Sequence, residues 1–169
     1  FGLVFQNFNL FPHFSVLKNV IDAPINVQKR DKAEVTAEAR ELLKKVGLEN
    51  KEDSYPGQLS GGQQQRAAIA RALIKNPKIL LCDELTGALD SKSSRQLLDS
   101  IEFLNKKLNS TILMVTHDAF TASYASRVIF IKDGKIFSEL NKENLSRKEF
   151  FDNIIDVVTL LGGEMNDAL

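Results

Sequence analysis

The segment over residues 59–66, Leu-Ser-Gly-Gly-Gln-Gln-Gln-Arg, places a hydroxyl group and two glycines immediately before an apolar helical pattern. Ser60 is a residue type that favours the N-cap position, and Gly61 and Gly62 have no side chain that would keep a ligand away from the backbone. A helix N-terminus offers unpaired N–H groups and the positive end of the helix dipole, and both attract phosphate. The segment therefore predicts a helix whose start can bind a phosphate-bearing ligand, whereas a bare Ser-Gly-Gly would be compatible with a flexible turn.

Other chemically capable side chains follow predicted strands. Asp83 and Glu84 come directly after the apolar run over residues 79–82, and His117 comes shortly after a second apolar run over residues 111–115. In open α/β sheets, ligands bind at the carboxyl ends of the strands. We therefore expect these three side chains to meet at one edge of the sheet. Taken one at a time, a solvated Asp-Glu pair and a structural histidine are the alternatives.

The elements that must position these residues alternate between strands and helices. Such alternation predicts an α/β fold with a mostly parallel sheet. Strands are expected over residues 1–5, 78–82 and 111–115, and helices over 31–46 and 91–108. The helix that follows the segment 59–66 is expected to stop at 75–77. A hairpin with an Asp-Gly turn is expected over 127–138, and a last helix, capped by Ser146 and Glu149, is expected to run to about 161.

Residues 15–58 show helical patterns without a convincing strand, which predicts a helical subdomain inserted between two strands. We divide the chain accordingly. The expected parts are a helical subdomain over about 15–75, a catalytic core made of 1–14 and 76–140, and a helical tail over 141–169.

Composition narrows the class of protein. The 169 residues include 22 Lys and Arg and 22 Asp and Glu, and this zero net charge argues against a dedicated nucleic-acid binder. The single cysteine, Cys82, excludes an internal disulfide and fits a reducing compartment. No apolar run approaches the roughly 18 residues of a membrane-spanning helix, and no signal-peptide pattern is present. Because Phe1 already belongs to a strand pattern, we expect the chain to start inside a domain.

The string over residues 59–66 resembles the signature motif of the ATP-binding-cassette (ABC) ATPases. Four further segments resemble motifs of the same family, and the five occur in the family's order from residue 1 to about 138. They are Gln6 of the Q-loop, the signature itself, Asp83 and Glu84 of the Walker B motif and its catalytic glutamate, residues 87–90 of the D-loop, and the switch histidine His117. The resemblance implies a P-loop NTPase-like fold.

The resemblance also implies a role for each residue at an ATP site. Asp83 would hold Mg²⁺ through water, Glu84 would act as general base on the attacking water, and His117 would contact the γ-phosphate. Gln6 would contact both Mg²⁺ and that water. Asp90 lies in the segment that links the two ATP sites of a dimer, and it could equally be the N-cap of the next helix. The partner's ATP would be bound by Ser60, Gly61, Gly62 and Gln63.

Family members work as head-to-tail pairs, so a homodimer or a paired ATPase subunit is expected. Transmembrane permease subunits would be the other partners, with the ATPase peripheral at the cytoplasmic face of the cell membrane. Near Gln6, the aromatic residues Phe8, Phe11 and Phe14 would lie close to the surface that receives a membrane subunit, or they would simply pack the subdomain. No nucleic-acid partner is expected.

Two departures from the family pattern bear on activity. The P-loop Gly-x-x-x-x-Gly-Lys-Ser/Thr, which holds the β- and γ-phosphates, does not occur in these residues, so we expect the 169 residues alone to bind ATP weakly and not to turn it over. Leu85 stands where the family usually has proline. Leucine would loosen the turn behind Glu84, which predicts slower hydrolysis that Leu85→Pro would test.

The transported molecule stays open. Residues 4–73 resemble the ATPases of polar amino-acid uptake, whereas residues 86–90, 117–120 and the tail over 150–164 resemble those of lipoprotein release and antimicrobial-peptide resistance. Two alternatives to a transport ATPase are a non-transport ABC ATPase of the chromosome-maintenance kind and a non-catalytic regulatory remnant. The first would need a long coiled coil, of which residues 6–60 show no sign. The second would have no need of Glu84 and His117.

Overall fold

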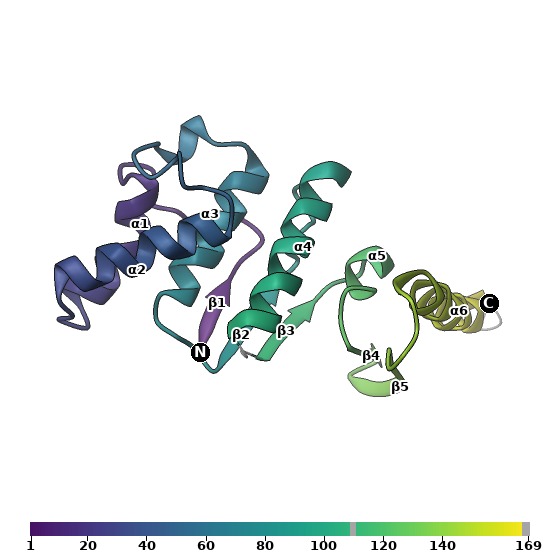
Figure 1. Ribbon diagram of the computed structural model, residues 1–169. Coiled ribbons are helices and arrows are strands. Elements are labelled where there is room, and N and C mark those ends of the chain that lie inside the picture. Colours follow the sequence, from purple (N-terminus) through teal and green to yellow (C-terminus); the bar gives the residue numbers. More distant parts are fainter. Residues whose placement is uncertain (109–110, 167–169) are drawn as a thin grey trace. The chain divides into compact units, whose positions relative to one another are not determined.

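The computed structural model describes residues 1–108 and 111–166, and the chain forms two compact units, Phe1–Val115 and Thr116–Leu169. In the first unit, helices and strands alternate as the sequence predicts. Its elements are β1 (Gly2–Val4), α1 (Val16–Asn26), α2 (Lys32–Lys45), a short 3-10 helix (Pro56–Gln58), α3 (Gly61–Leu73), β2 (Ile79–Asp83), α4 (Ser91–Leu108) and β3 (Thr111–Val115) (Figure 1).

Strands β1, β2 and β3 form a parallel sheet in that order. Val4 pairs with Cys82, and Cys82 pairs with Met114, so the carboxyl ends of the strands reach one edge of the sheet. Strand β2 extends one residue beyond the predicted run, because Asp83 pairs with Val115 and is itself the last strand residue. The predicted α/β fold with parallel strands is confirmed.

The two faces of this sheet differ in burial. Val4, Leu80 and Cys82 are buried in the main hydrophobic core, together with apolar residues of α1, α2, α3 and α4. On the alternate positions, Leu3 pairs with Leu81 and Leu81 pairs with Leu113, which makes a leucine row across the strands. Leu3 is 46% exposed and Leu113 is 55% exposed. Parallel sheets usually have both faces covered, so this apolar row is an unusual surface.

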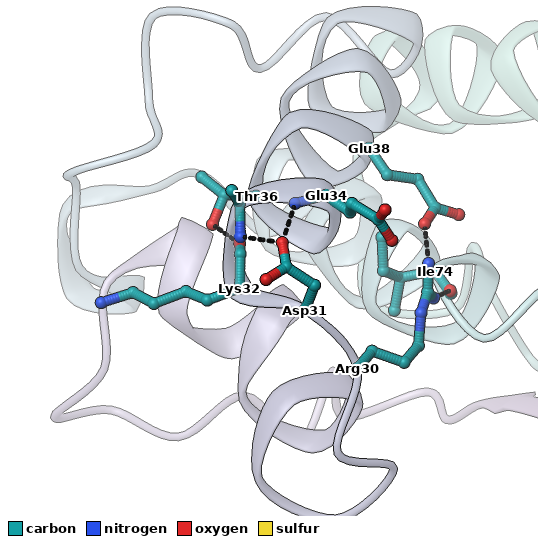
Figure 2. A network of polar contacts seen from close by, with 8 residues as sticks. Arg30, Asp31, Lys32, Glu34, Thr36, Glu38 and Ile74 are labelled. Carbon is teal, nitrogen blue, oxygen red and sulfur yellow. Dashed lines mark hydrogen bonds and ion pairs between the residues drawn. The ribbon is translucent and has the colours of Figure 1, made fainter.

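Helix α2 shows why the helical subdomain folds as it does. Asp31 caps the helix, since its carboxylate accepts hydrogen bonds from the N–H groups of Ala33 and Glu34 (Figure 2). The predicted apolar face is buried, and Gly47 ends the helix with φ +67°, a value that glycine adopts without strain. The buried residues of the helix are Val35, Ala39, Leu42 and Leu43.

Arg30, just before α2, connects that helix to the end of α3. Its guanidinium donates to the carbonyl oxygen of Ile74, at 3.1 Å, and pairs with the carboxylate of Glu38 (Figure 2). Cations are favourable near the C-terminus of a helix, where the last carbonyl groups lack helical partners. The C-terminal end of α3 is therefore held to α2 by a side chain outside either helix.

The second unit contains α5 (Ala119–Ala122), the antiparallel strands β4 (Arg127–Lys132) and β5 (Lys135–Asn141), and α6 (Arg147–Asn166). Asp133 and Gly134 both have positive φ in the hairpin turn, as the predicted Asp-Gly turn requires. The predicted capping of the last helix is confirmed, because Ser146 and Glu149 exchange backbone-to-side-chain hydrogen bonds of 2.9 and 3.3 Å.

Helix α6 continues past the predicted end near residue 161, to Asn166. The two glycines at 162 and 163 lower helix stability by about 1 kcal/mol each without excluding the conformation. Among the described residues, no helix combines the length and the apolar character that crossing a membrane requires.

Candidate functional site

The start of α3 has the structure that the residues 59–66 predict. Ser60 is the N-cap, and its hydroxyl accepts a hydrogen bond from the N–H of Gln63 at 3.4 Å. In return, the side-chain oxygen of Gln63 accepts from the N–H of Ser60 at 3.0 Å, which completes a capping box. The helix therefore begins at a fixed residue, with its positive dipole end at the two glycines.

Packing supplies a second reason for these glycines, one that the sequence did not show. A β-carbon on Gly61 would lie 3.1 Å from a methyl group of Leu89, and one on Gly62 would lie 3.0 Å from the β-carbon of Ser93. Such distances are shorter than ordinary van der Waals contact, so each side chain would force its neighbour to shift. The absence of side chains lets α3 begin directly against residues 89–93.

Asp83 and Glu84 sit at the carboxyl end of β2, as predicted. Asp83 is exposed and Glu84 is half-buried. The N–H of Glu84 donates to the carbonyl of Val115 at 3.0 Å, and Glu84 has φ +47°, an uncommon value for a residue with a side chain. The chain then turns sharply, because the N–H of Gly87 donates to the carbonyl of Glu84 at 3.1 Å.

Leu85, the residue that replaces the family's proline, is 3% exposed and belongs to the main core. The leucine therefore anchors the turn by burial, a packing contribution that its place in the motif did not suggest. A proline at this position would lack that anchor and would also favour an extended backbone at Glu84.

Gln6 lies against this turn. A β-carbon added to Gly87 would stand 2.8 Å from Nε2 of Gln6, so the amide occupies the space beside that glycine. The first unit thus brings together Gln6, the turn after Glu84 and, through Leu89, the capped start of α3. Segments far apart in the sequence therefore lie next to one another here.

Asp90 caps α4, which confirms the structural role that its position allowed. Its carboxylate accepts hydrogen bonds from the N–H groups of Lys92 and Ser93, both at 3.0 Å, and from the Ser93 hydroxyl at 2.7 Å. The hydrogen bond from the Ser93 hydroxyl is the largest of the influences that lower the pKa of Asp90 below its ordinary value.

His117 lies in the second unit, two residues after the last residue of β3. Its neighbour Asp118 caps α5, because its carboxylate accepts from the N–H and hydroxyl of Thr121, at 2.9 and 2.6 Å, and from the N–H of Phe120. The N–H of Asp118 also donates to the hydroxyl of Thr116 at 3.1 Å. These bonds fix the backbone on both sides of His117, while its approach to Asp83 and Glu84 stays a prediction.

Burial has the largest single effect on Asp118 and raises the pKa of that carboxyl group. Hydrogen bonds from Thr121 and Phe120, with the nearby His117, act in the opposite direction, and together they lower the pKa below its ordinary value. The helix cap next to the histidine is therefore an ionised carboxylate across the neutral pH range.

The loop after Gln6 depends on a residue that the sequence analysis missed. Asn19 is 3% exposed, and its amide nitrogen donates to the carbonyls of Phe11, Phe14 and Ser15 at 3.0 to 3.1 Å. Its oxygen accepts from the N–H of Phe11 at 2.8 Å. A polar residue between the buried Val16 and Val20 of one helix was the available signal.

Aromatic side chains of that loop pack on one another. Phe11 and Phe14 have ring centroids 5.3 Å apart, and the ammonium group of Lys18 lies 4.0 Å from the centroid of the Phe14 ring. Phe11 remains 49% exposed. The cluster therefore packs internally and still presents an aromatic surface, and its proximity to a membrane subunit stays a prediction.

The chain is similar to a known family and to ATP-binding proteins of named transport systems. The profile of a family described as "ABC transporter" matches residues 1–87. The bacitracin export ATP-binding protein BceA of Halalkalibacterium halodurans is 45% identical over 166 residues, which cover 98% of this chain and 65% of that protein. The L-cystine transport system ATP-binding protein TcyN of Escherichia coli is 51% identical over 139 residues, 82% of this chain and 55% of that protein.

A solved structure gives the same result for the fold. A dimeric ATP-binding cassette in a post-hydrolysis state bound to ADP and Pi superposes with a TM-score of 0.71 at 41% identity, over 85% of this chain and 63% of that one. The chain therefore spans less than two thirds of the length of these relatives.

Proposed function

The chain belongs to the ABC transporter family, as its motifs predicted, and on that premise we propose that it forms part of the ATP-binding and ATP-hydrolysing subunit of a transporter. One observation supports this most directly. The turn after Glu84 is contacted by Gln6, at Gly87, and by the capped start of α3, through Leu89. Hydrolysis needs a base and a residue that orients water, which Glu84 and Gln6 would supply, and the adjoining helix start would bind the phosphates of a partner's ATP.

In this proposal, Glu84 accepts the proton of the attacking water and Gln6 orients that water. The backbone of Glu84 is tied to Val115 by its N–H and to Gly87 by its carbonyl, so the carboxylate extends from a fixed turn. Positioning of this kind is a large part of catalysis in phosphoryl transfer, because little covalent chemistry is left for the protein to do. His117 is proposed to contact the γ-phosphate.

The donor groups fit a magnesium ion that is bound mainly by water and phosphate. Mg²⁺ in nucleotide sites typically takes one or two protein ligands and keeps several waters. Asp83 provides an exposed carboxylate at a strand end, and Gln6 provides an amide oxygen beside the turn at Gly87. When bound, the ion would neutralise phosphate charge.

The signature segment would serve a second subunit. Ser60, Gly61, Gly62 and Gln63 would bind the ATP of a partner, either a second copy or a paired ATPase subunit, in a head-to-tail dimer. The dimeric state of the similar cassette supports this arrangement. Binding of ATP would close the dimer and hydrolysis would reopen it, and transmembrane permease subunits would convert that motion into transport. The subunit would thus be peripheral at the cytoplasmic face of the membrane.

The relatives favour transport over the alternatives, and they leave two classes of transported molecule. BceA is named for bacitracin export, and its similarity extends over nearly the entire chain, including the tail. TcyN and the glutamate transport ATP-binding protein GluA of Corynebacterium glutamicum are named for amino-acid transport and match 82% and 90% of the chain. We propose an antimicrobial peptide or a polar amino acid as the transported molecule, with the match over the tail favouring the peptide.

The test is Glu84→Gln in the full-length protein. We expect ATP binding to persist, hydrolysis to fall about 100-fold or more, and the ATP-bound dimer to accumulate in size-exclusion chromatography. Glu49→Gln is the matched control, since Glu49 is an exposed carboxylate outside the site. Normal turnover in Glu84→Gln would remove Glu84 from its role, and absence of ATP turnover in the unmodified protein would contradict the proposed function.

A further inference from the structure

The loop that follows Gln6 has a backbone that needs external support. Phe8 has φ +54° and Asn9 has φ +49°, so two consecutive residues with side chains adopt the left-handed conformation. Such residues are strained and persist only where surrounding contacts hold them. The contacts that hold this loop are therefore informative about how Gln6 is placed.

Arg71 of α3 supplies two of these contacts. One terminal nitrogen of its guanidinium donates to the carbonyl of Phe8 at 3.0 Å, and the other donates to the carbonyl of Asn9 at 2.5 Å. Hydrogen bonds from a charged donor are stronger than neutral ones, and the planar fork of arginine can hold two acceptors at once. Both acceptors belong to the left-handed residues.

These two hydrogen bonds solvate the positive charge of Arg71. Arg71 is half-buried, and burial lowers the pKa of its guanidinium from the ordinary value, yet arginine stays protonated in proteins. No salt bridge to a carboxylate is found for Arg71 in the part of the chain that the structure describes. The two loop carbonyls therefore compensate a charge that would otherwise be poorly solvated.

Two other positions of α3 contact the same loop. Gln65, which is fully buried, donates from Nε2 to the carbonyl of Phe5 at 3.3 Å, immediately before Gln6. A β-carbon on Gly61 would lie 3.6 Å from the ring of Phe8. Residues on both sides of Gln6 are thus attached to the helix that the signature segment begins.

We propose that Arg71 is a positioning residue that clamps the loop after Gln6 onto α3, so that Gln6 and the signature segment move as one body. This inference rests on the proposed function for its consequence. In a head-to-tail dimer, Gln6 and Ser60 of one subunit belong to different ATP sites. The clamp therefore transmits a displacement at one ATP site to the other.

The clamp is tested by hydrogen–deuterium exchange in the full-length protein. Arg71→Met keeps the length of the side chain and removes every donor, so amide exchange over residues 6–10 should accelerate about tenfold or more. Arg71→Lys retains a charged donor and should restore part of the protection. Arg30→Met is the control, because Arg30 also binds α3 but at its far end, through Ile74.

Kinetics give the second readout. With Gln6 misplaced, kcat should fall about tenfold in Arg71→Met while the KM for ATP changes less than about twofold. Arg30→Met should leave both kcat and KM unaltered. Unchanged loop exchange in Arg71→Met, or equal acceleration in Arg30→Met, would overturn the clamp. If Arg71→Met does not fold, Arg71→Lys decides by the same comparison of loop exchange with Arg30→Met. If the unmodified protein does not hydrolyse ATP, the proposed function fails, but the exchange comparison still decides the clamp.

Discussion

Gly87 and Gln6 adjoin so closely that a β-carbon on Gly87 would lie 2.8 Å from Nε2 of the glutamine. Gln6 follows the first strand and Gly87 lies in the turn after the second, so the contact joins two motifs that are 81 positions apart in the sequence (87 minus 6). The atom that would be displaced is the far end of a flexible side chain. Substitution at Gly87 should therefore move Gln6 and leave the fold in place.

Gly87→Ala in the full-length protein tests this contact. We expect ATP turnover to fall about tenfold or more, since the misplacement of an orienting group by one ångström has effects of this size. The free energy of unfolding should change by no more than about 0.5 kcal/mol, as for most surface substitutions. Gly57→Ala is the control, because a β-carbon there meets no atom within 4 Å. Equal turnover in the two variants would show that Gln6 does not need this space.

Gly62→Ala should act on stability instead. Its β-carbon would meet the β-carbon of Ser93 at 3.0 Å, an atom that cannot rotate away. Overpacking of this kind costs about 1–3 kcal/mol, which exceeds the gain of up to about 1 kcal/mol that alanine brings over glycine in a helix. Urea unfolding should show the net loss. A more stable Gly62→Ala variant would mean that α3 can shift away from α4 at little cost.

Local interactions explain why part of the site could be predicted. Ser60 and Asp90 were expected to cap helices, and both do, because a cap depends on residues within three positions of it. The Asp-Gly turn and the Ser146 cap were predictable for the same reason. The parallel sheet followed from apolar runs that alternate with helical patterns.

The part of the site that the sequence did not predict depends on backbone carbonyl groups. Arg71 and Asn19 bind carbonyl oxygens, and a carbonyl leaves no trace in the sequence because every residue has one. The two carbonyl partners of Arg71 are 62 and 63 positions away, so no local pattern could indicate them. The left-handed backbone of Glu84 was likewise not predictable, since it occurs where the N–H of Glu84 bonds to Val115 in the neighbouring strand, far away in the sequence.

The exposed leucine row predicts a contrast between two residues of adjacent strands. Leu113 is 55% exposed and Leu80 is 1% exposed. In the 169-residue chain, Leu80→Gln should lower the free energy of unfolding by about 2–5 kcal/mol, because it buries an amide and leaves a packing defect. Leu113→Gln should change it by no more than about 0.5 kcal/mol and should reduce binding of a hydrophobic dye. A large loss of stability in Leu113→Gln would mean that the leucine row is covered in solution.

The acidic caps predict a loss of stability at low pH. The pKa of Asp118 is lower in the folded chain than its ordinary value of about 3.9, so the unfolded chain binds the proton more tightly. The stabilisation is therefore complete above the ordinary value and is lost as the pH falls through the folded pKa. Asp118→Asn should lower stability at pH 7 and should have a smaller effect at a pH below the lowered pKa of the folded chain, where the carboxyl group is protonated in both states.

Hydrogen exchange in α5 at pH 7 and at low pH measures how much Asp118→Asn destabilises that helix at each pH, and exchange in α4 does the same for Asp90→Asn. Asp90→Asn is the comparison, since Asp90 caps α4 through an exposed carboxylate whose pKa is also lowered by Ser93. Solvent screens an exposed group more strongly, so the pH dependence should be weaker at Asp90 than at the partly buried Asp118. An Asp118→Asn effect that is the same at both pH values would show that the cap acts through its hydrogen-bonding shape and not through its charge. In that case His117 would stand beside a cap whose strength does not depend on pH.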